Sequence, residues 1–195
     1  LALAFPALPD AQHYANVGMT RLRPLFPFYV SPDGVVLEHS LGYLVAGVNL
    51  VNAAIEYVEL LGEQVPAEWR AKLSGALRFE SAIRRPHGSI PQIGDTNGRE
   101  TLQRDALRIG HEAHRQERAL TVFPVAGYGV LWNPEAPGEL ASHTMMAWSN
   151  FDAHGHKHAD ELSVSLWAGG REWWSNVGYW SYDSPLRDEP VAWLQ

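Results

Sequence analysis

The chain contains no cysteine, so disulfides and thiolate metal sites are excluded. Basic residues are also few: 15 Lys and Arg stand against 22 Asp and Glu, which gives a formal net charge of -7. Because nucleic-acid-binding proteins neutralise phosphates with clustered Lys and Arg, this balance argues against a nucleic-acid partner. Because cysteine is absent, any metal ion must be bound by histidine and carboxylate groups.

Long apolar runs are missing as well. Gly, Asn, Pro or charged residues interrupt each run before the roughly 18 residues that a membrane span needs, so no span is predicted. The chain begins at Leu1 and shows no basic segment ahead of an apolar one, so we expect any export signal to lie outside it. Hydrophobic residues make up 46% of the chain, which is enough for a packed core.

The first part of the chain has the period of helices. Apolar residues recur at three- and four-residue spacings over residues 41–61, and Gly62 ends this run. Pro66 then opens a second helix that is predicted to span residues 66–83. The short connection predicts an antiparallel hairpin of these two helices. A third, more polar helix is predicted over residues 99–118.

From Leu120 the period changes to two, which is typical of strands. A "GG" turn at residues 168–171 predicts a hairpin between two of them. Helices followed by sequential strands, without alternation, indicate an α+β protein with segregated layers. We therefore predict a helical domain at residues 1–119 and an antiparallel β domain at residues 120–195.

Histidines cluster in "HGHKHAD", directly before a predicted strand. In an extended strand, His156 and His158 project to the same side, roughly 6 to 7 Å apart. Two imidazoles alone make an incomplete zinc site, and the plain alternative is a polar loop. Three histidines so close together, beside Asp160 and directly before a strand, make the polar loop the less favoured interpretation. A cupin site is not favoured, because Glu161 follows too soon. A metal-dependent hydrolase built on His154, His156 and His158 would require Asp or Glu side chains to converge on them.

Polar residues also gather in "DGVVLEHSLGY", residues 33–43, ahead of the first predicted helix. Glu38, His39 and Tyr43 lie at the helix entrance, where Ser40 can serve as the N-cap. A tyrosine acts as a base only where its neighbours favour the phenolate. Taken alone, the segment is better explained as a capping sequence with a half-buried tyrosine.

Four segments in the same order resemble the heparinase II/III family of polysaccharide lyases and its alginate-lyase relatives. They are "DGVVLEHSLGY", "PQIGDTNG", "AGYGVL" and "GHKHADELSVSLWAGGREWWSNVGYWSY". The resemblance implies the C-terminal part of an (α/α) toroid followed by an antiparallel β-sandwich, with a cleft between them. It also implies β-elimination on a uronic acid, which needs a positioned base and a group that stabilises the enolate-like intermediate.

The resemblance assigns roles to individual residues. Tyr43 matches the tyrosine that serves the family as base and as acid to the leaving oxygen, and His156 matches a histidine that contacts substrate. His158 matches a ligand of a structural zinc. Asn176 stands where the family usually has a second zinc ligand, an Asp, and a neutral amide is a weaker ligand than a carboxylate. Asp160 is expected to support the strand entry rather than bind metal.

Further residues are candidates for contact with an acidic sugar. Arginines bind carboxylate or sulfate through bidentate contacts, although arginine at a helix C-terminus also complements the helix dipole. The residue that neutralises the substrate carboxylate in the family is expected upstream of Leu1. The substrate-binding candidates are Glu38, His39, Arg84, Arg85 and Asp95.

The function predicted from the sequence is a lyase that cleaves an acidic polysaccharide, with Tyr43 and His156 in proton transfer. One structural zinc is the only cofactor considered, and the location expected from the resemblance is periplasmic or secreted. The alternative is a non-catalytic carbohydrate-binding or exopolysaccharide-processing protein of the same fold. Tyr43 and His156 that are separated or buried would favour this alternative.

Overall fold

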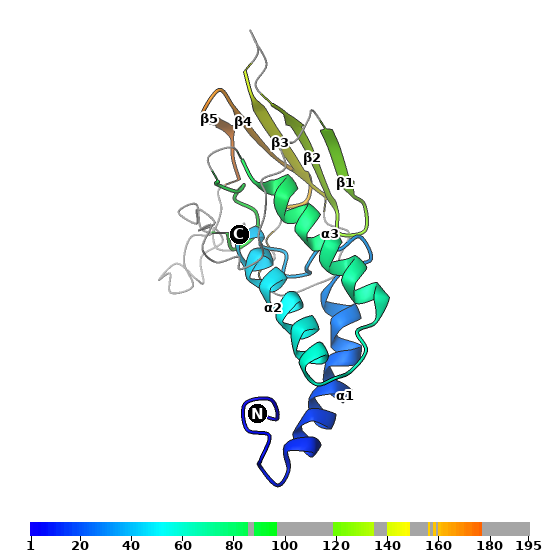
Figure 1. Cartoon of the computed structure of the whole chain (residues 1–195). Coiled ribbons are helices and arrows are strands. Elements are labelled where there is room, and N and C mark those ends of the chain that lie inside the picture. The colour runs from blue at the N-terminus through cyan, green and yellow to red at the C-terminus, as the bar shows by residue number, and fades with distance from the viewer. Residues whose placement is uncertain are drawn as a thin grey trace, which may run out of the picture.

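The computed structural model describes residues 1–85, 88–96, 119–134, 140–148, 156, 158 and 160–176. The helices within these residues are α1 (Ala11–Tyr29), α2 (Leu41–Leu60) and α3 (Ala67–Ile83). The strands are β1 (Ala119–Phe123), β2 (Tyr128–Asn133), β3 (Ser142–Ala147), β4 (Ser163–Ala168) and β5 (Arg171–Trp174). They form one antiparallel sheet in the order β1-β2-β3-β4-β5. Figure 1 shows the helices gathered toward one end of the sheet.

The periodicity arguments identified the central elements correctly. α2 and α3 confirm the helices predicted over residues 41–61 and 66–83, and β4 and β5 confirm the hairpin at residues 168–171. The mixed class, helices followed by an antiparallel sheet, is also confirmed. The helix predicted over residues 99–118 lies outside the described residues.

Helix α1 was not predicted individually. Pro24 and Pro27 lie inside it, and proline removes a backbone donor and normally interrupts a helix. Tertiary packing explains why this segment is nevertheless helical: the ring of Phe26, in α1, stacks on Trp69 of α3 with centroids 4.0 Å apart and planes 3° apart. Both side chains are buried.

Helix α2 supplies much of the core of the helical part. The side chains that it buries recur with a helical period: Leu41, Leu44, Val45, Val48, Val51, Ile55 and Val58. By length and composition alone α2 is also apolar enough to cross a membrane, with 44% of the apolar window buried. A core helix has the same composition, so the predicted lack of a membrane span remains a prediction.

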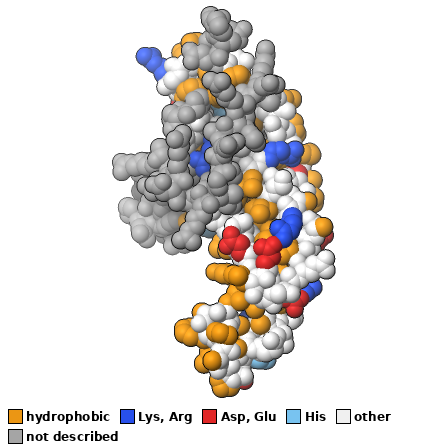
Figure 2. Space-filling model, viewed as in Figure 1, with side chains coloured by type: hydrophobic (Ala, Val, Ile, Leu, Met, Phe, Trp, Pro, Cys, Tyr) orange, Lys and Arg blue, Asp and Glu red, His pale blue; other side chains and the backbone are white. Residues whose placement is uncertain are grey.

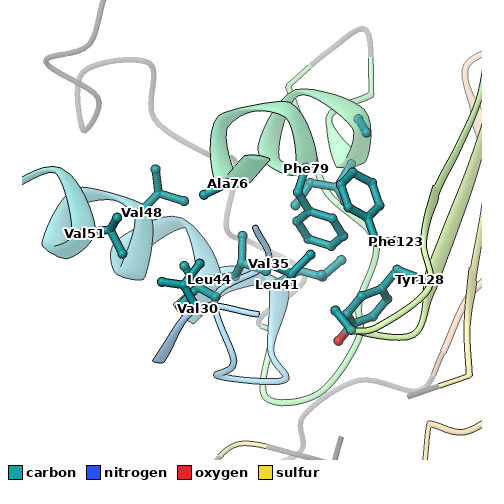
Figure 3. Packing of buried hydrophobic residues seen from close by; sticks show 14 of the residues in the cluster. Val30, Val35, Leu41, Leu44, Val48, Val51, Ala76, Phe79, Phe123 and Tyr128 are labelled. Atoms are coloured by element: carbon teal, nitrogen blue, oxygen red, sulfur yellow. The ribbon is translucent and has the colours of Figure 1, made fainter. Parts of the chain in front are cut away.

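Aromatic rings join the helices to the sheet. Phe79 of α3 packs edge-on against Phe123 of β1, with ring centroids 4.7 Å apart, and lies 5.2 Å from the ring of Tyr128 in β2. Figure 3 shows these rings in one cluster with Leu41, Leu44 and Ala76 from the helices. The helical and β parts of the described chain therefore share one hydrophobic core.

A glycine pair and an aspartate bring the chain before α2 against both parts. Gly34 has φ +90°, and a Cβ atom on it would lie 2.5 Å from Cα of Gly75 in α3, so only glycine fits this contact. The neighbouring Asp33 accepts hydrogen bonds through Oδ2 from the backbone N–H groups of Val125 and Ala126, at 2.8 and 3.2 Å. The entrance of α2 is thereby tied to the turn between β1 and β2.

The two faces of the sheet are both apolar, but only one of them is buried. The face toward the helices buries Phe123, Tyr128, Val130, Met145 and Ala147. The opposite face is apolar but exposed; its paired side chains include Leu120, Val122, Leu131, Met146 and Val164. Such a contiguous exposed apolar face normally packs against another layer or partner.

Candidate active site

The candidate site is assembled from three segments that are distant in sequence. They are the entrance of α2 (residues 38–43), the loop at residues 90–96, and the residues that precede β4, namely 156, 158 and 160. The loop contacts both of the other segments.

The loop caps helix α2. Ser40 occupies the N-cap position, but its side chain makes no capping hydrogen bond. The Thr96 hydroxyl instead accepts a hydrogen bond from the backbone N–H of Gly42 at 3.1 Å and lies 3.1 Å from the Ser40 hydroxyl. The predicted capping role of the Ser40 side chain is therefore wrong: a residue 54 positions from Gly42 performs it.

Gly94 lies where the three segments meet. It has φ +60°, and a Cβ atom on it would lie 2.2 Å from the carbonyl oxygen of His39 and 2.6 Å from that of His156. No side chain fits this space. The Gly94 N–H also donates to Asp160 Oδ2 at 2.7 Å, and the Asp160 carbonyl accepts from the Ser163 N–H at 2.9 Å. Asp160 thus supports the entry of β4, as predicted.

The next residue in the loop, Asp95, lies between the two predicted histidines. Its Oδ2 is 2.9 Å from Nδ1 of His156, and its Oδ1 is 2.5 Å from Nε2 of His158. The histidines do converge, but not by alternation along a strand. His156 has φ +57°, and β4 begins only at Ser163, so a shared carboxylate rather than a β-strand brings the imidazoles together.

Tyr43, in the first turn of α2, contacts the same histidine. Its ring stacks on His156 with centroids 3.8 Å apart and planes 19° apart. Both side chains are accessible, because Tyr43 is 41% exposed and the His156 side chain is 31% exposed. The two residues predicted for proton transfer therefore lie in direct contact on the surface, one from the helical part and one from the segment that enters the sheet.

Glu38 completes this surface. Its Oε2 is 3.7 Å from Nε2 of His156, and its side chain is 26% exposed. The Tyr29 hydroxyl, at the end of α1, donates a hydrogen bond to the Glu38 carboxylate. Burial, together with this bond and the carboxylate charge, raises the pKa of Tyr29 well above its usual value, so the donor stays protonated. Tyr29 was missed by the sequence argument.

The remaining substrate-binding candidates are His39, which is buried at the entrance of α2, and Arg84 and Arg85, which follow α3. Arg85 is buried and donates to Ser165 Oγ at 2.8 Å and to Glu172 Oε1 at 2.5 Å, so its guanidinium anchors the end of α3 to β4 and β5. Arg84 forms an ion pair with the buried Glu80, one turn earlier. His39 is only 4% exposed. These positions do not support direct substrate contact by His39 or Arg85.

A further histidine lies beside Arg85. His143, fully buried in β3, donates from Nε2 to the carbonyl oxygen of Ala82 at 2.8 Å. Burial lowers the pKa of His143 to about 4, the positive charge of Arg85 acts in the same direction, and the hydrogen bond opposes both. This ring therefore remains neutral and structural at neutral pH.

The two expected zinc ligands bind different carboxylates, and zinc binding stays a prediction. His158 Nε2 faces Asp95, whereas the Asn176 amide donates to Asp160 Oδ1 and to Ser163 Oγ. Asp95 does converge on His156 and His158, as a metal-dependent hydrolase would require. However, no group of three or more His, Asp or Glu side chains in the described part of the chain is placed to hold a metal ion. His154 lies outside that part.

Comparison with family models decides the family. The model described as "Heparinase II/III N-terminus" matches residues 2–120, and the model described as "Heparinase II/III-like, C-terminal" matches residues 115–193. The chain belongs to the heparinase II/III family. The resemblance carried by the four sequence segments is thereby confirmed, and the members of this family are polysaccharide lyases. A search of curated proteins finds no match.

Solved structures with the same fold include heparinase-family enzymes. The heparan sulfate lyase HepC from Pedobacter heparinus superposes with a TM-score of 0.72 at 18% identity, covering 100% of this chain and 33% of that one. A structure of the heparinase III BT4657 gene product gives 0.74 at 17% identity, with coverage of 100% and 33%. A second one, with methylated lysines, gives 0.71 at 18%, with 92% and 30%. This heparinase II/III chain spans about a third of each of these structures.

Proposed function

We propose that the protein containing this chain is a polysaccharide lyase that cleaves an acidic, uronate-containing polysaccharide by β-elimination. The observation that carries the proposal is the contact between Tyr43 and His156, whose rings stack with centroids 3.8 Å apart while both remain accessible. A non-catalytic carbohydrate-binding protein would not require this pair to meet at the surface.

The chemistry assigns complementary tasks to these groups. The C5–H bond of the uronate breaks, its electron pair forms the C4–C5 double bond, and the C4–O4 pair leaves with the oxygen, which takes up a proton. In our proposal the Tyr43 oxygen removes the C5 proton and returns a proton to the leaving oxygen, which is general base and acid catalysis by one group. His156 contacts the sugar beside Tyr43, and the Glu38 carboxylate supports His156 from the other side of its ring.

Zinc is not part of this proposal. His158 and Asn176 are engaged with Asp95 and Asp160 respectively, and the described residues do not converge on an ion. No step is therefore routed through a metal. A structural zinc involving other parts of the protein remains a prediction from the resemblance.

The exposed apolar surfaces support the proposed toroid and sandwich. The outer face of the sheet carries exposed Leu120, Leu131 and Val164, and the helices expose Leu25, Phe28, Leu50, Tyr57 and Leu60. Figure 2 shows hydrophobic side chains collected over the helical end of the molecule. We infer that further helices cover the exposed apolar surface of the helices and that a second sheet covers the outer face of the sheet. With the family resemblance, this organisation favours a periplasmic or secreted lyase.

The proposal is tested by incubating the full-length protein with alginate, heparan sulfate, hyaluronan and bacterial exopolysaccharides. Ultraviolet absorbance of the unsaturated product reports cleavage, and a lyase of known activity serves as the positive control. Cleavage of at least one polymer is expected. Binding without any absorbance change, under conditions where the control lyase works, would favour the carbohydrate-binding alternative.

Tyr43→Phe provides the matched test of mechanism. Removing the hydroxyl is expected to lower kcat/KM by on the order of 10²- to 10⁴-fold, the usual contribution of a positioned acid or base. Tyr57→Phe is the control, because Tyr57 lies on the same helix and is 57% exposed. Equal activity in the two variants would exclude Tyr43 as the base.

A further inference from the structure

Asp95 holds two imidazoles with one carboxylate. Its Oδ2 faces Nδ1 of His156 at 2.9 Å and its Oδ1 faces Nε2 of His158 at 2.5 Å. An ionised carboxylate only accepts hydrogen bonds, so the ring nitrogen on each side must carry the proton. His156 therefore donates through Nδ1 and His158 through Nε2, so in their neutral forms the two histidines are opposite tautomers.

This assignment decides which nitrogen of His156 can accept a proton or a hydrogen bond. A neutral imidazole carries one N–H, so a proton on Nδ1 leaves the lone pair on Nε2. Nε2 is the nitrogen on the Glu38 side of the ring, 3.7 Å from Oε2. The same ring stacks on Tyr43, so the acceptor nitrogen belongs to the accessible surface that these three residues form.

The position of Asp95 suits this task better than substrate contact. The Asp95 side chain is only 9% exposed, against 31% for His156. Its backbone N–H donates to the His156 carbonyl at 3.2 Å, so main chain and side chain bind the same residue. Gly94 beside it is fixed by its contacts with His39, His156 and Asp160. The Asp95 carboxylate is thus held on the buried side of the two imidazoles.

We propose that Asp95 is a positioning residue that holds His156 in the Nδ1–H tautomer, so that Nε2 is the acceptor nitrogen in the active site. The use of Nε2 during turnover rests on the proposed lyase function, whereas the tautomer does not. Loss of a partner that fixes an imidazole in this way typically lowers activity by roughly 10- to 100-fold, and more where the wrong tautomer results.

Nuclear magnetic resonance of full-length protein labelled with 15N-histidine tests the tautomer, since protonated and unprotonated ring nitrogens have well-separated shifts. The His156 signals are identified by their loss in His156→Gln. In the wild type we expect Nδ1 protonated and Nε2 unprotonated, and in Asp95→Asn we expect the Nε2–H form to gain population. Asp10→Asn, the same change on an exposed carboxylate ahead of α1, is expected to leave the tautomer unchanged.

The wild-type spectrum alone decides the assignment, even if Asp95→Asn fails to fold. An Nε2–H tautomer of His156 in the wild type would overturn the proposal. So would an unchanged tautomer in folded Asp95→Asn.

Kinetics separate positioning from substrate binding on any polymer that the wild type cleaves. Asp95→Asn is expected to lower kcat by roughly 10- to 100-fold while KM changes little. Asp95→Glu keeps the charge and is expected to recover part of the loss. A raised KM with unchanged kcat would identify Asp95 as a substrate contact and overturn the proposal. If no polymer is cleaved, the proposed function fails while the tautomer result stands by itself.

Discussion

Two polar clusters join the helices to the sheet-forming part of the chain, and they differ in how far their side chains are exposed to solvent. The buried cluster consists of Arg85, His143 and Ser165, and the partly exposed Glu172 binds Arg85 at its edge. The open cluster consists of Glu38, Tyr43, Asp95, His156 and His158. The Arg85 side chain is 3% exposed, whereas His156 is 31% exposed and Tyr43 is 41% exposed. Similar residue types therefore serve stability in one place and are available for chemistry in the other.

The partners of the histidines sharpen this contrast. His143 donates to the backbone carbonyl of Ala82, a neutral acceptor inside the protein. His156 and His158 both donate to the Asp95 carboxylate, which makes stronger, charge-assisted hydrogen bonds. The open cluster is also held by main-chain contacts of Gly94, whereas Arg85 of the buried cluster is held by the side chains of Ser165 and Glu172. Perturbing each cluster should therefore produce different losses.

The largest expected effect comes from Gly94→Ala. The added methyl would lie 2.2 Å from the His39 carbonyl oxygen and would sit on a residue with φ +60°. We expect the free energy of unfolding to fall by roughly 4 kcal/mol, measured by urea denaturation, and polymer cleavage to be lost as the open cluster separates.

Gly62→Ala is the matched control for Gly94→Ala. Gly62 has φ +75°, but nothing lies within 4 Å of an added Cβ atom. Only the backbone strain remains, so a loss of about 1 kcal/mol is expected, with activity retained. Equal losses in the two variants would show that the close contact at Gly94 does not hold the open cluster.

Because His143 is buried, we expect the free energy of unfolding to depend on pH between about 6.5 and 4. Its pKa is lowered from 6.5 to about 4 by burial, with Arg85 contributing. As pH falls through about 6.5, His143 becomes protonated in the unfolded chain, whereas in the folded chain it stays neutral until about pH 4. Stability therefore falls across this window, by up to about 3 kcal/mol, and this contribution does not change further below it.

Urea denaturation between pH 7 and pH 4 measures this effect. His143→Gln is expected to be less stable at pH 7 but to lose less stability on acidification than the wild type. His13→Gln, at an exposed position of α1, is the control and should follow the wild-type curve. Parallel curves for His143→Gln and the wild type would contradict the buried, neutral histidine.

Local patterns and long-range contacts differed in how well they could be predicted. Helical periodicity and the "GG" turn depend on neighbouring residues, and both identified α2, α3 and the β4–β5 hairpin. The positions of Tyr43 and His156 came from family motifs. The burial of Arg85 could not be predicted, because its partner Glu172 lies 87 residues later and only the folded sheet brings them together.

The same reasoning explains how the partner of Glu38 was missed. Tyr29 is the last residue of a helix that contains two prolines, and no local motif connects it with the segment around Glu38. In the sequence Tyr29 has only the appearance of an apolar core residue. Its hydrogen bond to Glu38 emerges from the packing of α1 against the entrance of α2. The open cluster is therefore supported from α1 as well.

Tyr29→Phe tests this support and is expected to have the smallest effect. The ring keeps its packing, but the Glu38 carboxylate loses a donor, so stability should fall by about 1 kcal/mol. Cleavage should decrease by less than about 10-fold, since Glu38 supports the site from 3.7 Å rather than reacting. Tyr14→Phe, at an exposed position of the same helix, is the control. A loss as large as that of Tyr43→Phe would place Tyr29 in the chemistry itself, because removal of a supporting hydrogen bond alone does not account for it.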